Sequence, residues 1–196
     1  LYRVGARNEN PARTGFAHLF EHLMFRGTRA VENFDLPVQM ASGDNNAFTN
    51  NDYTDFYITL PKDNLETALW LESDRMEGLD ITPAKLEAEK KVVIEEFRQR
   101  YLNQPYGDQT MLLRALAYKV HPYRWAAIGL ATDHIAGATL ADVESFYRAH
   151  YRPSNAILSI SADMEEERML ELAEKWFAPL ADHPSATAAI PQEPMQ

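Results

Sequence analysis

The sequence predicts an α+β fold. Helical and strand-like segments follow one another without the regular β–α alternation of a doubly wound sheet. No internal repeat is visible. The chain has 196 residues, 45% of them apolar, which is enough for one substantial core or two small ones.

Composition excludes several classes of protein. A net charge of −10 argues against a nucleic-acid binder, which needs a basic face. No apolar run is long enough for a transmembrane helix. The absence of cysteine excludes disulfides and thiolate metal sites, and it leaves the cellular compartment open.

The first half of the chain predicts two helices and a hairpin. Thr14 can cap a helix that runs to about Phe25 and stops at Gly27. Residues 33–43 suggest a short helix. Residues 45–60 alternate and are rich in β-branched and aromatic side chains, which indicates two strands around a turn at 50–52.

Helical signals dominate the next stretch. Residues 62–78 place apolar side chains and one glutamate on a single stripe, namely Leu65, Leu69, Glu72 and Met76. Thr82 followed by Pro83 is a strong helix start, and this helix is expected to reach about Tyr101. Another helix is expected from Pro105 to about Lys119.

The last third predicts helix, strand and helix. The capping-box pattern of Thr139–Asp142 starts a helix to about His150. The segment NAILSISA (155–162) is expected to be a strand, and Asp163 to cap a final helix to about Phe177.

The domain organisation follows from these patterns. Residues 1–178 form the predicted domain, and the opening LYRVGA looks like a strand entered partway, so we expect a further N-terminal strand before Leu1. Residues 179–196 contain four prolines and no period, which predicts a linker or tail toward a C-terminal domain.

The stretch HLFEH, residues 18–22, carries the strongest functional signal. On a helix, His18, Glu21 and His22 fall within one arc of roughly 100°. No lysine or arginine lies between Gly15 and Phe25, so this arc is not an ordinary solvated face. Buried polar groups need partners.

Two interpretations are open for this arc. It can be a pair of hydrogen-bonded core histidines with a chance glutamate. It can also be a metal site, because imidazoles at i and i+4 can share one Zn²⁺, with Glu21 placed to take a proton from a metal-bound water. A catalytic zinc normally has three protein ligands, so His18 and His22 need a third.

The segment PAKLEAEKKVVIEEFRQR offers that third ligand. Glu89 and Glu96 are two helical turns apart and share a face with Val92 and Val93. Carboxylates among valines are costly unless they are paired or bind metal. The two lie roughly 10 Å apart along the axis, so only one can be a ligand, and the spacing leaves open which one.

Here the sequence resembles a known family. HLFEH is the inverted zinc motif H-x-x-E-H. With GDNNAFTNNDYTDFYITLP, LESDRM, EKKVVIEEFRQR, QPYG, HPYRW and HYRPSNAILSISAD, it resembles the pitrilysin/insulinase (M16) metallopeptidases. Within them it is similar to bacterial members akin to the mitochondrial processing peptidase β subunit. The resemblance extends to about Leu180.

The resemblance implies a reaction and the roles of the residues. It implies a zinc-dependent endopeptidase acting on short or unfolded peptides through a zinc-activated water, with one Zn²⁺ per site. His18, His22 and Glu96 would be the metal ligands, Glu89 would support the site from outside, and Glu21 would be the general base.

It also implies architecture and partners. The expected fold is a ferredoxin-like sheet layered with helices (LuxS/MPP-like metallohydrolase), as in the N-terminal M16 domain. In the family, two such halves pair, so we expect a C-terminal M16-like domain or partner subunit, as a dimer or as paired halves. Asn46 and Ala47 lie on the edge strand to which a peptide substrate would add.

Two rival functions remain. One is a non-catalytic partner or scaffold subunit of the same fold, and the intact set of five motif residues argues against it. The other is a metal-binding protein without hydrolysis, in which a base at Glu21 would have no use.

Overall fold

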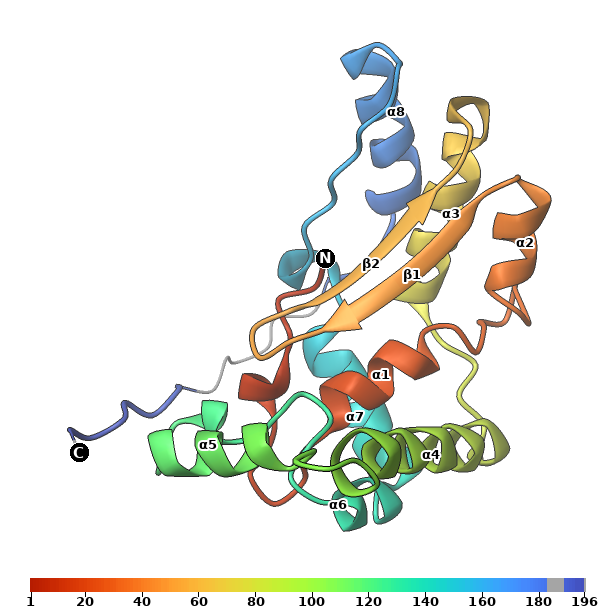
Figure 1. The fold of residues 1–196 in the computed structure, drawn as a ribbon. Helices are drawn as coiled ribbons and strands as arrows, with labels where there is room; N and C mark the ends of the chain where they lie inside the picture. The colour runs from red at the N-terminus through yellow and green to blue at the C-terminus, as the bar shows by residue number, and fades with distance from the viewer. Residues whose placement is uncertain (183–188, 196) are drawn as a thin grey trace.

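The computed structural model describes residues 1–182 and 189–195, and it confirms the α+β prediction. A two-stranded antiparallel sheet, β1 (Asp44–Thr49) and β2 (Thr54–Thr59), packs with the helices of the chain (Figure 1). The helices in chain order are α1 (Phe16–Leu23), α2 (Asp35–Met40), α3 (Leu65–Glu77), α4 (Pro83–Phe97), α5 (Gln109–Ala117), α6 (Thr132–Ala136), α7 (Leu140–His150) and α8 (Glu166–Phe177).

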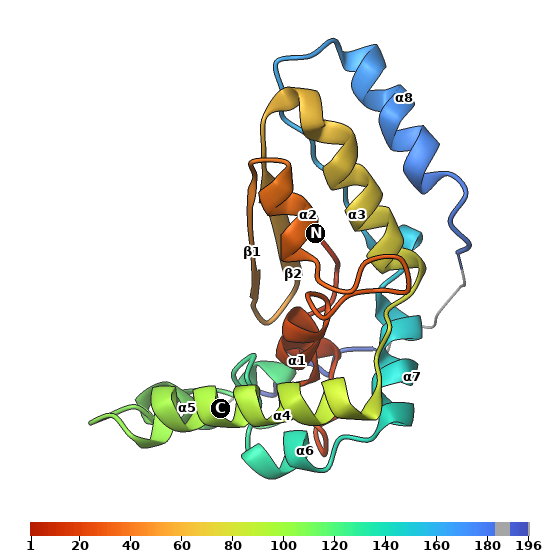
Figure 2. The ribbon, with the colours of Figure 1, turned by 90° about the vertical axis from the view of Figure 1, so that its right-hand side faces the viewer.

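The helices form two groups around the hairpin. Figure 2 shows the hairpin edge-on, with α3 and then α8 layered on one side of it. Helices α1, α4, α5, α6 and α7 lie below this layer in the same view. The short helix α1 therefore lies between the sheet and α4, and it contacts both.

Helix α1 is the centre of the main core. Phe16, Leu19, Phe20 and Leu23 are buried, and the Phe20 ring stacks on Tyr151 of the segment that follows α7, at 5.1 Å between centroids. Large aromatic surfaces of this kind contribute much of the free energy of burial. The helix is thus fixed on its apolar side, which leaves its histidine side toward α4.

Several predicted elements are confirmed by their local signals. The hairpin has the expected turn, with Asn46 paired to Tyr57 and Thr49 to Thr54. The Thr82 hydroxyl accepts a hydrogen bond from the Lys85 N–H at the start of α4. Thr139 and Asp142 form the expected capping box of α7 (hydroxyl to Asp142 N–H, 3.2 Å).

Three helix starts differ from the prediction. Thr14 does not cap α1, because its hydroxyl accepts the N–H of Leu130 instead, at 2.8 Å. Helix α5 begins at Gln109 rather than Pro105, since Tyr106 has φ of 60° and cannot continue a helix. Asp163 pairs with Lys62 at 2.7 Å, so α8 starts only at Glu166.

Two helix ends also differ. Helix α1 ends at Leu23 instead of Phe25. Helix α4 ends at Phe97, and residues Arg98–Leu102 continue it as a wider π-helical turn. The predicted end near Tyr101 therefore falls within that turn.

Residues 155–162 do not form a regular strand. Ile157 exchanges two backbone hydrogen bonds with Leu1 (2.8 and 3.0 Å), and Tyr2 makes isolated bridges to Thr54 and Ala156. Among the described residues, the backbone hydrogen bonds that join this segment to a distant part of the chain go to residues 1–3, so the ladder is too short to count as a strand.

The predicted tail is described in part. Residues 183–188 and 196 lie outside the described residues. Farther along, the Glu193 carboxylate accepts the backbone N–H groups of Lys119, Val120 and His121 at 2.6–3.0 Å. In the described part of the chain, no helix has the length and apolarity of a membrane span.

Candidate metal centre

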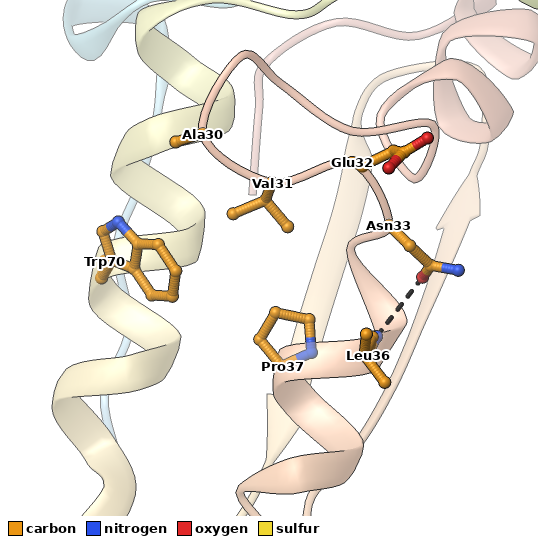
Figure 3. A pocket seen from close by; sticks show the side chains of 7 residues that line it. All are labelled: Ala30, Val31, Glu32, Asn33, Leu36, Pro37 and Trp70. Carbon is orange, nitrogen blue, oxygen red and sulfur yellow. Dashed lines mark hydrogen bonds between the residues drawn. The ribbon is translucent and has the colours of Figure 1, made fainter.

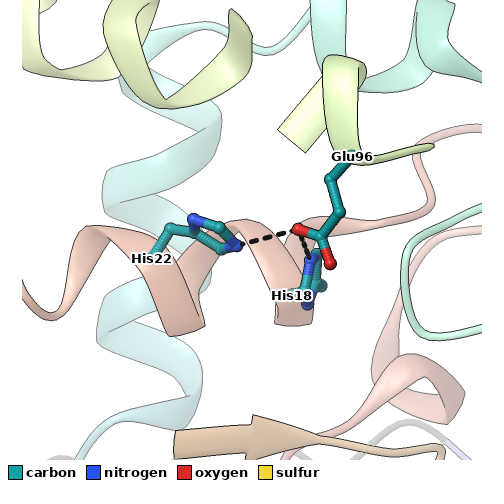
Figure 4. A group of neighbouring side chains, drawn as sticks. All are labelled: His18, His22 and Glu96. Carbon is teal, nitrogen blue, oxygen red and sulfur yellow. Dashed lines mark hydrogen bonds and ion pairs between the residues drawn. The ribbon is translucent and has the colours of Figure 1, made fainter. Parts of the chain in front are cut away.

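Two helices bring the motif side chains together. Helix α1 carries His18, Glu21 and His22, and α4 carries Glu89 and Glu96. Figure 4 shows Glu96 reaching from the end of α4 toward both histidines of α1. His18 is 7% exposed and Glu89 only 1%, so the group lies at the inner boundary between the two helices.

The two imidazoles converge on one carboxylate oxygen. His18 Nε2 lies 3.0 Å and His22 Nε2 lies 3.3 Å from Glu96 Oε2. Among the described residues, His18, His22 and Glu96 form a group whose ligand atoms all lie within 4.8 Å of one another.

These spacings fit a tetrahedral zinc ion. Bonds of about 2.0–2.1 Å place the ligand atoms of a tetrahedron roughly 3.3–3.4 Å apart. The separations of 3.0 and 3.3 Å between each Nε2 and Glu96 Oε2 are close to that value. Two neutral nitrogens and one carboxylate oxygen are also a ligand set that zinc accepts while leaving a fourth position open.

The other ring nitrogens are held by carboxylates. His18 Nδ1 lies 3.3 Å from Glu21 Oε2, and His22 Nδ1 lies 3.3 Å from Glu89 Oε2. Such carboxylate contacts orient a ligating imidazole and set its tautomer. Glu89 thus contacts a histidine rather than the point where the three ligand atoms meet.

Two arginines neutralise the acidic side of the group. Arg26 contacts Glu89, and Arg100 Nη2 lies 2.9 Å from Glu96 Oε1. Arg100 therefore binds the oxygen of Glu96 that the histidines do not use. This leaves Oε2 of Glu96 directed at the histidines.

The pKa values reflect this mutual pairing. Burial alone would lower the pKa of His22, but hydrogen bonds to Glu89 and Glu96 outweigh it and raise that pKa to about 9. The same balance, with Glu21 and Glu96 as partners, raises the pKa of His18. Hydrogen bonds from His18 and His22 hold the pKa of Glu96 far below its ordinary value. The site strongly favours positive charge between these side chains, as a cation site must.

Glu21 faces the hairpin as well as His18. Burial raises the pKa of its carboxyl, but hydrogen bonds from His18 and from Thr49 of β1 outweigh burial and lower it. Glu21 is therefore ionised at neutral pH and able to accept a proton. Through its contact with Thr49, the end of β1 lies near the metal group, which consists of His18, His22 and Glu96.

In the described part of the chain, no strand pairs with the outer edge of β1. Thr54 exchanges both of its backbone hydrogen bonds with Tyr2, at 2.8 and 3.1 Å, so its pair with Thr49 is a non-hydrogen-bonded one. Because such pairs alternate along an antiparallel ladder, the N–H and C=O of Ala47 point off the outer edge. The exposed Asn46 side chain accepts that Ala47 N–H at 2.8 Å.

Two cavities lie away from the metal ligands. One, of about 510 Å³, lies between Trp70 and the segment 30–37, where Val31 and Pro37 face the indole (Figure 3). Another, of about 570 Å³, lies between β2, α3 and residues 153–161. Neither is lined by His18, His22 or Glu96.

Sequence reasoning missed some residues at the site. Arg100 stands four residues after Glu96, and this i, i+4 pairing could have been read from the sequence. Thr49 lies in the segment NNAFTN that resembles the family, but its contact with Glu21 depends on the tertiary fold. Glu9 contacts the start of α1, and no local pattern marks it.

Comparisons with known proteins agree on one family. A family model described as Insulinase (Peptidase family M16) matches residues 2–126, and a model described as Peptidase M16 inactive domain matches residues 137–196. The five motif residues all lie in the first range. More than half of the chain is thus covered by the peptidase model.

Two relatives illustrate the similarity. Zinc protease PqqE of Helicobacter pylori is 35% identical over 200 residues, covering 100% of this chain and 45% of that protein. The probable mitochondrial-processing peptidase subunit beta of Arabidopsis thaliana is 24% identical over 191 residues, covering 95% of this chain and 35% of the relative. The chain spans less than half the length of these relatives.

Solved structures share the fold. A protease from Helicobacter pylori has a TM-score of 0.90 at 35% identity, covering 100% of this chain and 47% of that one. The first half of the periplasmic protease PqqL from Escherichia coli has a TM-score of 0.85 at 22% identity, covering 100% and 43%. At that lower identity the likeness shows the fold alone.

Proposed function

The chain belongs to the insulinase family of peptidases (M16), and we propose that it is the zinc-bearing part of a metalloendopeptidase that hydrolyses short or unfolded peptides. The observation that carries this proposal is the meeting of His18 Nε2, His22 Nε2 and Glu96 Oε2 at 3.0 and 3.3 Å. Relatives named zinc protease support the choice of metal.

His18, His22 and Glu96 would hold the ion. Zinc bound there would supply Lewis acidity, which lowers the pKa of water and polarises a carbonyl. The ionised Glu21 accepts the proton that the attacking water loses and then delivers it to the leaving amine. Glu89 keeps the His22 ring oriented through Nδ1.

The substrate would lie on the outer edge of β1. A free strand edge accepts the backbone of any peptide, so it suits an enzyme with a broad range of substrates. In this proposal the Asn46 side chain releases the Ala47 N–H, and the substrate carbonyl takes its place. Thr49 then places the peptide next to Glu21.

A second M16-like half would complete the enzyme. The chain covers 45% of its relative PqqE, and residues 137–196 match a second family model. Holding the scissile carbonyl in position can remove several kcal/mol of barrier. We propose that a C-terminal domain or a partner subunit provides part of that positioning for the domain formed by 1–178, with 179–196 as the connection.

The alternative is a non-catalytic subunit of the same fold, favoured by the match of residues 137–196 to a family model described as inactive. Glu21 distinguishes the two, because a scaffold needs no ionised base beside the metal ligands.

The test is metal analysis followed by digestion of a random peptide mixture, with the chain alone and with a second M16-like half. Zinc with cleavage supports the peptidase, and a metal-free, inactive pair of halves supports the scaffold.

A further inference from the structure

Glu9, which lies outside the motif, binds the start of helix α1 through its buried carboxylate. Glu9 is 6% exposed. Its Oε2 accepts the Gly15 N–H at 2.9 Å and its Oε1 accepts the Ala17 N–H at 2.8 Å. The carboxylate thus satisfies two backbone donors at the beginning of α1, six and eight residues farther along the chain.

Helix α1 has no cap of its own. Gly15 occupies the N-cap position with φ of 93° and carries no side chain. A Cβ there would lie 2.7 Å from the Ile128 carbonyl oxygen, so no capping residue can replace it. The first N–H groups of a helix need acceptors, and a carboxylate also complements the positive end of the helix dipole.

Glu9 is itself anchored. The indole Nε1–H of Trp125, a residue only 1% exposed, donates to Glu9 Oε2 at 3.1 Å and to the Ala6 carbonyl at 3.0 Å. Burial raises the pKa of Glu9 to about 8, although the N–H groups of Ala17, Gly15 and Trp125, which donate to its two carboxyl oxygens, act in the opposite direction. The carboxylate therefore links its own segment and that of Trp125 to the first turn of α1.

This contact bears directly on the metal group. Ala17 immediately precedes His18. Successive residues of a helix are rotated by about 100° about its axis, so a shift in the first turn of α1 would change the directions of both the His18 and the His22 side chains. Metal sites require ligand distances within about 0.2 Å of their ideal values. A loosened helix start would therefore spread the Nε2 atoms away from Glu96.

We propose that Glu9 is a positioning residue of the metal centre, which fixes the start of α1 so that His18 and His22 face Glu96. This inference rests on the proposed zinc site. The inference requires that loss of the Glu9 contacts lower zinc affinity more than loss of a comparable cap on another helix does.

Thr139 offers the matched control. It caps α7 by accepting the Asp142 N–H at 3.2 Å, and α7 carries no residue of the metal group. Glu9→Gln keeps the shape of the side chain but turns one acceptor into a donor facing N–H groups. Both Glu9→Gln and Thr139→Ala remove a helix cap, so both are expected to lower the melting temperature.

The experiment measures zinc affinity by competition with a chelator and records the visible spectrum of the Co²⁺-loaded protein, well below the melting temperature. We expect Glu9→Gln to bind zinc about 10–100-fold more weakly and to change the Co²⁺ spectrum. Thr139→Ala is expected to match wild type in both. Equal zinc affinity and equal spectra in Glu9→Gln and Thr139→Ala would overturn the inference.

Two further outcomes are separable. If wild type binds no zinc, the proposed function fails, and the inference with it. If Glu9→Gln does not melt cooperatively, Glu9→Asp replaces it, since it keeps the charge and draws the carboxylate back by one methylene. A folded Glu9→Asp protein with wild-type zinc affinity and Co²⁺ spectrum would contradict the positioning role.

Discussion

His18 Nε2 lies 3.0 Å from Glu96 Oε2, although 78 residues separate them in the chain. His22 Nε2 reaches the same oxygen at 3.3 Å. Glu89, two turns earlier on α4, lies against the far nitrogen of His22 instead. Glu89 and Glu96 share one face of α4 but have different partners. Substituting each of them is therefore expected to change zinc affinity by a different amount.

Glu96→Gln is expected to reduce zinc affinity more than Glu89→Gln does. Gln at 96 replaces a charged ligand with a neutral one, whereas Gln at 89 removes only the carboxylate that orients His22, which typically costs about 10–100-fold. Zinc titration of both variants measures the difference. A larger loss in Glu89→Gln would reverse the two roles.

Ala47→Pro is expected to impair cleavage while zinc remains bound. The Ala47 N–H points off the edge of β1, so proline removes no bond of the hairpin ladder but deletes a donor for the substrate. One lost hydrogen bond predicts a roughly 2–10-fold fall in kcat/KM. Ala47→Ser keeps the N–H and is expected to retain full activity, so equal kcat/KM in both variants would exclude substrate pairing at this edge.

His150 is expected to make stability depend on pH. Burial, with a smaller contribution from Arg152, lowers the pKa of its imidazole to about 4. The unfolded chain therefore binds more protons between pH 4 and about 6.5, and stability is lost as pH falls through that window. Urea unfolding at several pH values is expected to show a loss of about 1–3 kcal/mol that His150→Gln lacks. Parallel pH profiles would refute this.

A second M16-like half is expected to raise peptide cleavage without raising zinc content. The chain carries all three candidate ligands and Glu21, but a peptide also has to be held in place. Cleavage is measured with the chain alone and after adding the second half. Full turnover by the 196 residues alone would contradict the need for it.

Local signals in the sequence predicted the elements that depend on neighbours in the chain. The caps at Thr82 and Thr139 and the turn after Thr49 are short-range features, and each is present. Thr14 and Asp163 also look like caps, but tertiary partners, Leu130 and Lys62, take their side chains. Whether such a residue caps a helix therefore depends on which tertiary partners compete for its side chain.

The same limit applies to the site. Helical spacing places His18 and His22 on one side of a helix and Glu89 and Glu96 on one side of another. The angle between α1 and α4, which decides which glutamate meets the imidazoles, is a tertiary property. Glu9 is the clearest case, because nothing in the sequence around it indicates that its carboxylate binds the start of α1. The roles of all these residues remain predictions.

Zinc content and peptide cleavage in wild type and in Glu21→Gln, each assayed with a second M16-like half, test whether the proposed metal centre catalyses hydrolysis. Glu21 touches the Nδ1 side of His18, not the Glu96 oxygen where the ligand atoms meet. We expect one zinc per chain in both proteins and a fall in cleavage by about 10²–10⁴-fold in the variant. Wild-type cleavage by Glu21→Gln would contradict the assignment of the base, and wild-type protein without zinc would contradict the metal centre itself.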